Sequence, residues 1–314
     1  MASSTIGILL MAYGTPSRIE DIEPYYTHIR HGHPPTTEQL QDLLRRYDAI
    51  GGLSPLNKVT KDQAQELEKA LNRKNDRNFH VYLGMKHSTP FIDDAVKEMV
   101  EDGVTTAVGL VLAPHYSTMS VGTYHKEARV AAQKYGLRAI HLIASWHMQD
   151  AFLDALCHRV QQCAEKLDQS GMHKVKTVFS AHSLPERILQ DHDPYVSQLL
   201  ETSKAIAQCA NIADWQFAWQ SAGRTKDVWL GPDILLVIKE LANTGYDGIL
   251  SCPVGFVSDH LEVLYDLDRE ASAMAASYGL SFERTTSLNA TPQLIEALVS
   301  AIDEALADSE LGMF

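Results

Sequence analysis

The sequence predicts an α/β protein with two doubly wound domains, each built around a parallel four-stranded sheet. Short runs that are apolar on both faces alternate with amphipathic helical stretches along the whole chain, as expected for buried parallel strands joined by helical crossovers. Four such runs precede about residue 150 and four follow it, although the two halves differ in sequence. Each half is therefore expected to fold as a Rossmann-like domain.

The individual elements follow in order. The predicted strands are IGILLMAYG, HVYLGMKHS, AVGLVLAPH, RAIHLIAS, VKTVFSAHS, WQFAWQSAG, GILSCPVGF and LSFERTTS. The stretch TPFIDDAVKEMVEDG predicts a helix, with Thr89 as its N-cap, Pro90 in the first turn, Asp93 and Asp94 near the start and Gly103 at the end.

The predicted domains are residues 1–165 and 166–314, with a boundary segment at about residues 162–174. The first domain carries a long helical insertion, at about residues 20–75, after its first strand. Ligands of doubly wound sheets bind at the carboxyl ends of the strands, so the strand-end residues are the first candidates for a site, and a cleft is expected between the domains.

The composition excludes several classes of partner and cofactor. With 27 basic and 40 acidic residues the net charge is −13, which disfavours binding to nucleic acid and to anionic membranes. The four cysteines form no CxxC pair, which is typical of a reducing compartment and argues against an iron–sulfur cluster. There is no Gly-rich nucleotide motif, and the N-terminal apolar run is too short to span a bilayer. We expect a cytoplasmic protein without stable membrane insertion.

Two strand-end segments carry candidate chemistry. The stretch KTVFSAHSLPE places His182 just after a buried strand, and the stretch PVGFVSDHLEVLYDLDRE leads into a helix with Glu262, Asp266 and Glu270 at i, i+4 and i+8. A histidine and a row of carboxylates suit a divalent ion such as iron that is held loosely and passed on. A hydrogen-bonded core histidine and a solvated acidic face are the alternatives.

The insertion combines aromatic and basic side chains. These would suit a flat apolar ligand with peripheral carboxylates, but they also fit an ordinary helix surface. The residues are Tyr25, Tyr26, Arg30, Arg45, Arg46 and Tyr47.

Six motifs together resemble the ferrochelatase family, in particular its soluble, monomeric, Gram-positive type, which acts on coproporphyrin III. They are LLMAYGTP, RYDAIGGLSPL, LAPHYST, FSAHSLPE, WQSAG…WLGPD and PVGFVSDHLEVLYD, and the resemblance extends from about residue 5 to about residue 275. It implies a chelatase-like fold that inserts Fe²⁺ into coproporphyrin III to form Fe-coproporphyrin in haem biosynthesis. It further implies Fe²⁺ as a substrate, no tightly bound cofactor, no iron–sulfur cluster, no nucleotide, and a monomer open to transient contacts with neighbouring haem-pathway enzymes.

The same resemblance implies roles for individual residues. His182 and Glu262 would form the inner metal site, Asp266 and Glu270 an acidic path toward it, and Tyr13 would approach the iron from the other porphyrin face. The residues that would line the macrocycle and its propionates are Arg30, Arg46, Tyr47, Ser54, Lys86, His87 and Tyr124. The basic loop with Arg224 and Lys226 could offer further cations to carboxylates.

Four other functions remain open from the sequence. They are a ferrochelatase for protoporphyrin IX, a related chelatase that loads cobalt or nickel into another tetrapyrrole, a non-catalytic porphyrin or haem carrier, and an ordinary nucleotide-binding α/β protein. Metal assays separate the cobalt or nickel chelatase, tight binding without turnover would reveal a carrier, and the missing Gly-rich loop disfavours the nucleotide-binding protein.

Overall fold

The chain divides into two compact units in the computed structural model. The residues described are 5–74, 77–223 and 225–310. The first unit comprises Met1–Gln149 and Asn289–Phe314, and the second comprises Asp150–Leu288. Within the described ranges, no helix has the length and apolar character needed to cross a bilayer.

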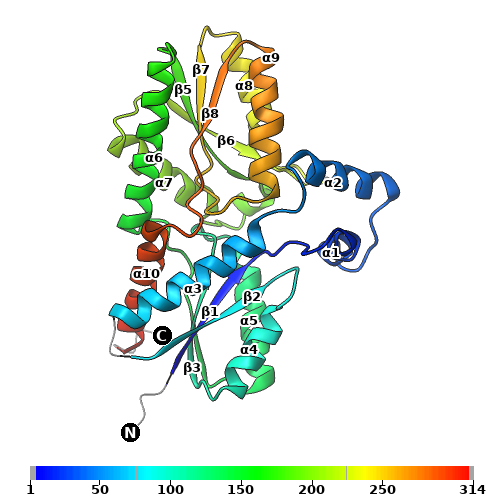
Figure 1. The fold of residues 1–314 in the computed structure, drawn as a ribbon, viewed down its shortest axis with the longest axis vertical. Helices are drawn as coiled ribbons and strands as arrows, with labels where there is room; N and C mark the ends of the chain where they lie inside the picture. Colours follow the sequence, from blue (N-terminus) through cyan, green and yellow to red (C-terminus); the bar gives the residue numbers. More distant parts are fainter. Residues whose placement is uncertain (1–4, 75–76, 224, 311–314) are drawn as a thin grey trace. The chain divides into compact units, whose positions relative to one another are not determined.

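The first unit is built on a parallel sheet with strand order β2-β1-β3-β4 (Figure 1). Its strands are β1 (Ile6–Ala12), β2 (Phe79–Met85), β3 (Thr106–Val111) and β4 (Ala139–Leu142). In β1 the four consecutive residues from Ile8 to Met11 are fully buried, because helices cover both faces of the sheet. This explains why the strand is apolar on both faces rather than alternating.

The helices of this unit lie on both faces of its sheet. They are η1 (Ile19–Asp21), α1 (Ile22–Ile29), α2 (Thr37–Ala49), α3 (Leu56–Lys74), α4 (Ile92–Glu101), α5 (Val121–Tyr135) and α10 (Pro292–Glu310). Helices α4 and α5 pack side by side, and α10 packs on α3 (Figure 1). Helix α4 buries Ile92, Ala95, Val96 and Met99, the i, i+3, i+4, i+7 pattern of an amphipathic helix.

The start of α4 differs from the prediction. The helix begins at Ile92, so Thr89 does not cap it and Pro90 precedes its first turn. The backbone N–H of Met85 donates to the Pro90 carbonyl at 2.7 Å, and Phe91 forms an isolated parallel bridge with Met85, so the helix starts only after this contact with the end of β2. The Asp94 carboxylate accepts from the Phe91 N–H at 2.9 Å and thereby satisfies a free donor at the helix start.

The second unit repeats the architecture, with strand order β6-β5-β7-β8 in a second parallel sheet. Its strands are β5 (Val175–His182), β6 (Trp215–Gln220), β7 (Gly248–Cys252) and β8 (Ser281–Arg284). Its helices are α6 (Asp150–Gln169), η2 (Glu186–Leu189), α7 (Tyr195–Cys209), α8 (Ile234–Ala242), η3 (Val263–Ala271) and α9 (Ser272–Ser277). Helices α6 and α7 pack together, and so do α8 and α9 (Figure 1). All eight predicted strands and both parallel sheets are confirmed.

The division into units differs from the predicted domains, 1–165 and 166–314. Helix α6 belongs entirely to the second unit because it packs on β7, β8 and α7, and Lys166 pairs with Glu283 of β8 at 2.5 Å. Helix α10 returns to the first unit, where Lys74 pairs with Asp303 at 2.9 Å and Gln63 donates to the Asn289 carbonyl at 2.9 Å. The sequences of α6 and α10 each show an amphipathic helix that could pack on either sheet. Only the packing in the folded protein decides which unit each helix joins.

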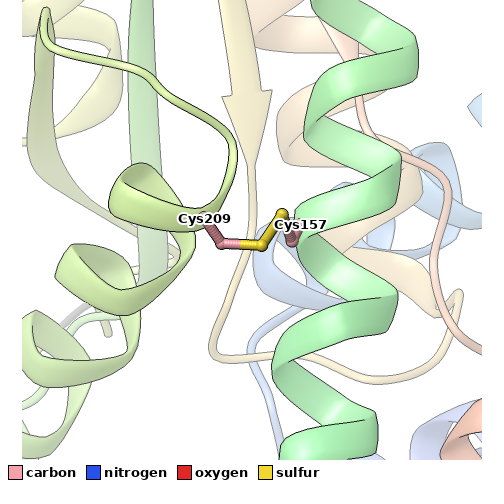
Figure 2. Close-up of a disulfide and its surroundings, with 2 residues drawn as sticks. All are labelled: Cys157 and Cys209. Atoms are coloured by element: carbon pink, nitrogen blue, oxygen red, sulfur yellow. A yellow bond between two sulfur atoms is a disulfide. The ribbon is translucent and has the colours of Figure 1, made fainter.

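A disulfide joins Cys157 in α6 to Cys209 at the end of α7 (Figure 2). The two residues are 52 positions apart, and no local motif marks them as a pair. The bond differs from the cysteine usage of a reducing compartment that the sequence predicts, because only the packing of α6 on α7 brings the two thiols together. Cys163 and Cys252 are free and buried.

Reduction of this disulfide should lower the free energy of unfolding. In the chain-entropy model, a loop of this length contributes up to about 4 kcal/mol. Denaturant unfolding with and without a thiol reductant measures the effect, and the Cys157→Ala/Cys209→Ala variant, which should not respond to the reductant, is the control. Superimposable wild-type curves under both conditions would contradict the prediction.

Candidate active site

His182 is the last residue of β5, the strand that lies between β6 and β7 in the sheet. Its Nδ1 lies 2.5 Å from the Ser183 carbonyl oxygen. Because a carbonyl only accepts, Nδ1 must carry the hydrogen, and Nε2 presents the lone pair of the neutral ring. The Tyr195 hydroxyl donates to the His182 carbonyl at 3.0 Å and fixes the backbone at the strand end.

The loop after β7 brings Glu262 to this strand end. The approach depends on Gly255, whose N–H donates to the Ser180 carbonyl at 3.3 Å. A Cβ at position 255 would lie 2.5 Å from the Cβ of Ala181 and 3.0 Å from its Cα, so no side chain fits there. The glycine thus allows the loop to pack directly on β5 beside His182.

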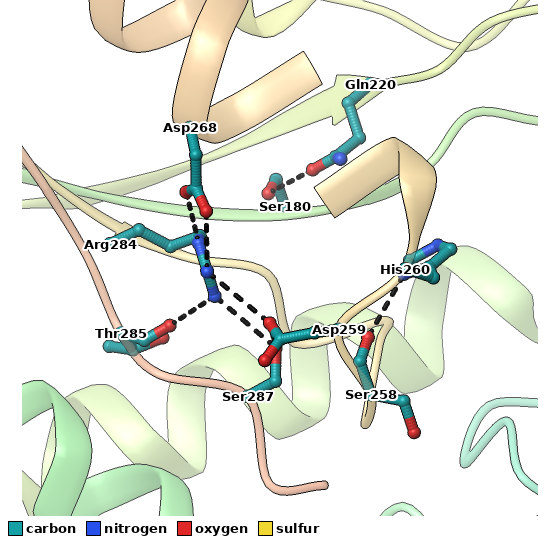
Figure 3. A network of polar contacts seen from close by, with 9 residues as sticks. All are labelled: Ser180, Gln220, Ser258, Asp259, His260, Asp268, Arg284, Thr285 and Ser287. Carbon is teal, nitrogen blue, oxygen red and sulfur yellow. Dashed lines mark hydrogen bonds and ion pairs between the residues drawn. The ribbon is translucent and has the colours of Figure 1, made fainter. Parts of the chain in front are cut away.

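The Glu262 carboxylate lies between two imidazoles. One oxygen is 3.5 Å from His182 Nε2, and the other is 3.5 Å from His260 Nε2. His260 Nδ1 donates to the Ser258 carbonyl at 3.1 Å (Figure 3). Both rings therefore hold Nδ1 on a backbone carbonyl and turn Nε2 to the Glu262 carboxylate. Sequence reasoning missed His260, although its position two residues before Glu262 was a usable signal.

Electrostatics couple these groups. Burial lowers the pKa of His182, but the Glu262 carboxylate and the Ser183 carbonyl outweigh burial and raise that pKa to about 9. Burial raises the pKa of Glu262, and the two histidines outweigh it, so this pKa lies well below its usual range. The free protein at neutral pH therefore holds an imidazolium next to a carboxylate.

The predicted acidic row runs along η3, which is coiled as a π-helix rather than an α-helix. Glu262 directly precedes η3. Asp266 is buried and accepts from the Ser221 hydroxyl at 2.5 Å, whereas Glu270 is exposed. The row thus connects the surface to the His182 side of the unit, and its middle member is already hydrogen-bonded. π-Helical segments occur frequently at functional sites.

In the first unit, Tyr13 and His87 lie together at neighbouring strand ends. Their ring centroids are 4.5 Å apart, and Tyr13 is 43% exposed. His87 Nδ1 is 2.9 Å from His28 Nδ1, and the Tyr25 ring stands edge-on to His87 at 6.5 Å. Burial, followed by the positive charge of Lys86, lowers the pKa of His87 to about 3, so this ring is neutral.

Lys86 directly precedes His87 at the end of β2. Its Nζ donates to the Thr123 hydroxyl at 2.5 Å and stands 4.9 Å from the centroid of the buried Tyr124 ring. Burial lowers the pKa of Lys86, while Glu127 acts in the opposite direction. The structure thus brings Lys86 and Tyr124 into contact, as a cation over an aromatic face.

The remaining predicted residues of the first unit are more dispersed. Arg30 donates to the His33 carbonyl at 3.2 Å, and Arg46 pairs with Asp42 at 3.2 Å. The buried Tyr47 hydroxyl is 3.1 Å from the Thr15 hydroxyl, and Ser54 is also buried. Of the two cations predicted in the second unit, Arg224 lies outside the described residues, and Lys226 is exposed.

The second unit offers a metal ion few ligands, as an open site does. In the part of the chain that the structure describes, no group of three or more His, Cys, Asp or Glu side chains is arranged to hold an ion. His182 and Glu262 offer one nitrogen and one carboxylate, a donor set that suits a borderline divalent cation. Such a pair can deliver an ion to another ligand more readily than a closed cage can.

The chain is similar in sequence to known proteins over nearly its whole length. The ferrochelatase family model matches residues 5–306. A coproporphyrin III ferrochelatase of Halalkalibacterium halodurans is 47% identical and aligns over 99% of this chain and 100% of its own length. The protein of the same name from Bacillus subtilis is 45% identical over 96% of this chain and 98% of its own length.

Solved structures show the same fold at low identity. The sirohydrochlorin chelatase SirB from Bacillus subtilis subspecies spizizenii, in complex with cobalt, has a TM-score of 0.60 and 12% identity, and the match covers 98% of this chain and 97% of SirB. CbiX, named as the terminal enzyme of sirohaem biosynthesis in denitrifying bacteria, has a TM-score of 0.54 and 12% identity, with 95% and 99% covered. The family model and the near full-length relatives together show that the chain belongs to the ferrochelatase family.

Proposed function

We propose that this protein inserts Fe²⁺ into coproporphyrin III to form Fe-coproporphyrin in haem biosynthesis. The observation that carries the proposal is the His182–Glu262 pair, with Nε2 of one residue turned to the carboxylate of the other. The coproporphyrin III ferrochelatases that align over nearly the whole chain support this choice of substrate. Iron is a substrate here, and the proposal includes a cytoplasmic monomer without an iron–sulfur cluster or nucleotide.

The chemistry asks two things of the protein. A free porphyrin is flat and carries two pyrrole N–H protons, so the ring must bend and lose both protons as the ion enters. A rigid site that fits the bent ring lowers the barrier, because it binds the transition state better than the flat substrate. His182, once neutral, has a single free lone pair at Nε2, which takes a proton or ligates iron but not both together. Glu262 and His260 extend the route by which a proton leaves.

The residues of the first unit would hold the macrocycle. Tyr13 is exposed at its strand end and would approach the metal from the opposite face of the ring. Lys86 and His87 follow the end of the neighbouring strand β2 and would meet the ring edge. The other proposed contacts to the ring and its carboxylates are Arg30, Arg46, Tyr47, Ser54 and Tyr124.

Anaerobic incubation with Fe²⁺ and coproporphyrin III, followed by absorbance, tests the proposal. Conversion of the free-base spectrum to the iron-porphyrin spectrum at a catalytic rate supports it. Stoichiometric binding without turnover would identify a carrier. Turnover only with Co²⁺ or Ni²⁺ and another tetrapyrrole would identify a different chelatase.

Glu270→Gln should raise the KM for iron more than it lowers kcat. An exposed carboxylate that guides an ion contributes on the order of 1 kcal/mol or less, so a roughly two- to fivefold rise is expected. The rate is measured against iron concentration at low and high salt. Glu240→Gln, an exposed carboxylate on α8, is the matched control. An unchanged iron dependence would leave this face as a solvated surface.

The protein should prefer coproporphyrin III, with four propionates, to protoporphyrin IX, with two. A well-formed charge-assisted hydrogen bond is worth roughly 1.5–3 kcal/mol, so even one extra contact in the transition state changes kcat/KM about tenfold or more.

Arg46→Ala should reduce this ratio more than it changes the iron dependence. Arg45→Ala is its control, because Arg45 pairs with the same Asp42 but has a side chain that is 70% exposed. Both porphyrins are compared in the same detergent, since aggregation penalises protoporphyrin. Equal or reversed specificity would assign the protein to the protoporphyrin-using enzymes.

A further inference from the structure

Arg284, the last residue of β8, carries a guanidinium that is largely enclosed by protein. Its side chain is 12% exposed. The guanidinium donates two parallel hydrogen bonds to the Asp268 carboxylate, from Nε to Oδ1 at 2.5 Å and from Nη2 to Oδ2 at 2.8 Å (Figure 3). This fork geometry is specific to arginine, because a lysine ammonium offers a single point of attachment.

The remaining donors of Arg284 reach a second group of acceptors. Nη1 donates to the Thr285 carbonyl at 2.9 Å and to the Ser287 hydroxyl at 3.3 Å, and Nη2 lies 3.5 Å from Asp259 Oδ1. The Ser287 hydroxyl in turn donates to the same Asp259 oxygen at 2.7 Å. A guanidinium has five N–H donors, and each has an acceptor here, so this side chain is committed to the protein.

The two carboxylates that Arg284 holds enclose the metal-binding segment in sequence. Asp259 immediately precedes His260, and Asp268 lies in η3, six residues after Glu262. Arg284 therefore contacts both ends of the segment from Asp259 to Asp268, which contains Glu262. We propose that Arg284 is a positioning residue, which holds the Glu262 carboxylate against His182 by clamping Asp259 and Asp268 together.

The π-helical conformation of η3 explains why Glu262 needs such a clamp. η3 is a π-helix, a conformation that is rarely stable by itself and usually appears as a single turn. Its start therefore needs a tertiary contact if the carboxylate before it is to keep one position. A displacement of about 1 Å at a reacting group costs on the order of 100-fold in rate. The expected effect on kcat rests on the proposed function. The expected effect on cation binding can be measured without it.

Arg284→Lys tests the clamp, because it keeps the charge and loses the fork. We expect kcat for iron insertion to fall at least tenfold, with the dissociation constant for porphyrin, measured by fluorescence, changed less than twofold. Binding of Co²⁺ to the porphyrin-free protein, followed by its visible absorbance, should weaken at least fivefold. Glu283→Gln is the matched control: it changes the preceding residue of β8 and removes only the ion pair with Lys166.

Wild-type kcat and Co²⁺ affinity in a folded Arg284→Lys variant would overturn the proposal. If that variant does not fold, Ser287→Ala decides, since it removes one hydroxyl and no charge. It should weaken Co²⁺ binding about threefold, and behaviour identical to Glu283→Gln would show that Arg284 only stabilises the fold. Wild-type protein that binds Co²⁺ without inserting iron would refute the proposed function and leave the Co²⁺ comparison to decide the clamp.

Discussion

Replacing His182 by alanine should lower kcat for iron insertion by at least about 100-fold. The expectation follows from the position of Nε2, the His182 ring nitrogen that faces Glu262. A positioned proton acceptor contributes roughly 10²–10⁴-fold, and the loss of an iron ligand adds to this. Porphyrin binding should stay nearly intact, because the proposed contacts to the macrocycle lie in the first unit.

The measurement is the initial rate of insertion together with porphyrin fluorescence quenching. His173→Ala is the control, since it removes an exposed histidine of the same unit that pairs with Asp168 at 3.1 Å. Turnover near the wild-type rate in His182→Ala would falsify the assignment of His182.

Glu262→Gln should also reduce kcat by about 100-fold, because the amide keeps the shape of the side chain and loses its charge. The double variant His182→Ala/Glu262→Gln should be little worse than the poorer single variant, since residues that act as a unit are not additive. Fully multiplicative losses would show that the two residues act independently.

Glu262→Gln should also lower the pKa of His182. In the wild-type protein the pKa of His182 is raised to about 9, chiefly by Glu262 against the opposing effect of burial. The stability that this ion pair contributes is fully present below the unfolded pKa, near 6.5, and is lost as the pH rises through about 9. Without the carboxylate, burial dominates and the pKa falls. NMR titration of the imidazole in the porphyrin-free protein measures the difference, and an unchanged midpoint would contradict the coupling.

The strands and the crossover helices could be predicted because their signals are local. The doubly buried run of β1 and the apolar stripe of α4 are each complete within one element. The strand-end position of His182 was predicted for the same reason. A rule for parallel sheets then placed it among the candidate site residues, without any knowledge of distant contacts.

Features that depend on contacts between distant segments were missed. The pairing of Cys157 with Cys209 requires α6 and α7 to pack together. The contact of the His260 imidazole with Glu262 requires the loop after β7 to be in place. The π-helical coil of η3 has no periodicity that distinguishes it from an α-helix in one sequence. The start of α4 was misplaced because a backbone contact from Met85 to Pro90 overrode the capping pattern.

The return of α10 to the first unit has a consequence for how the chain is made. Leu294, Leu298 and Ile302 are fully buried there, against a helix and a strand that leave the ribosome some 200 residues earlier. The second unit is continuous and can complete its core during synthesis. The first must wait until α10 has been synthesised, with part of α3 uncovered, which makes it the part of the nascent chain that is most exposed to aggregation and chaperones.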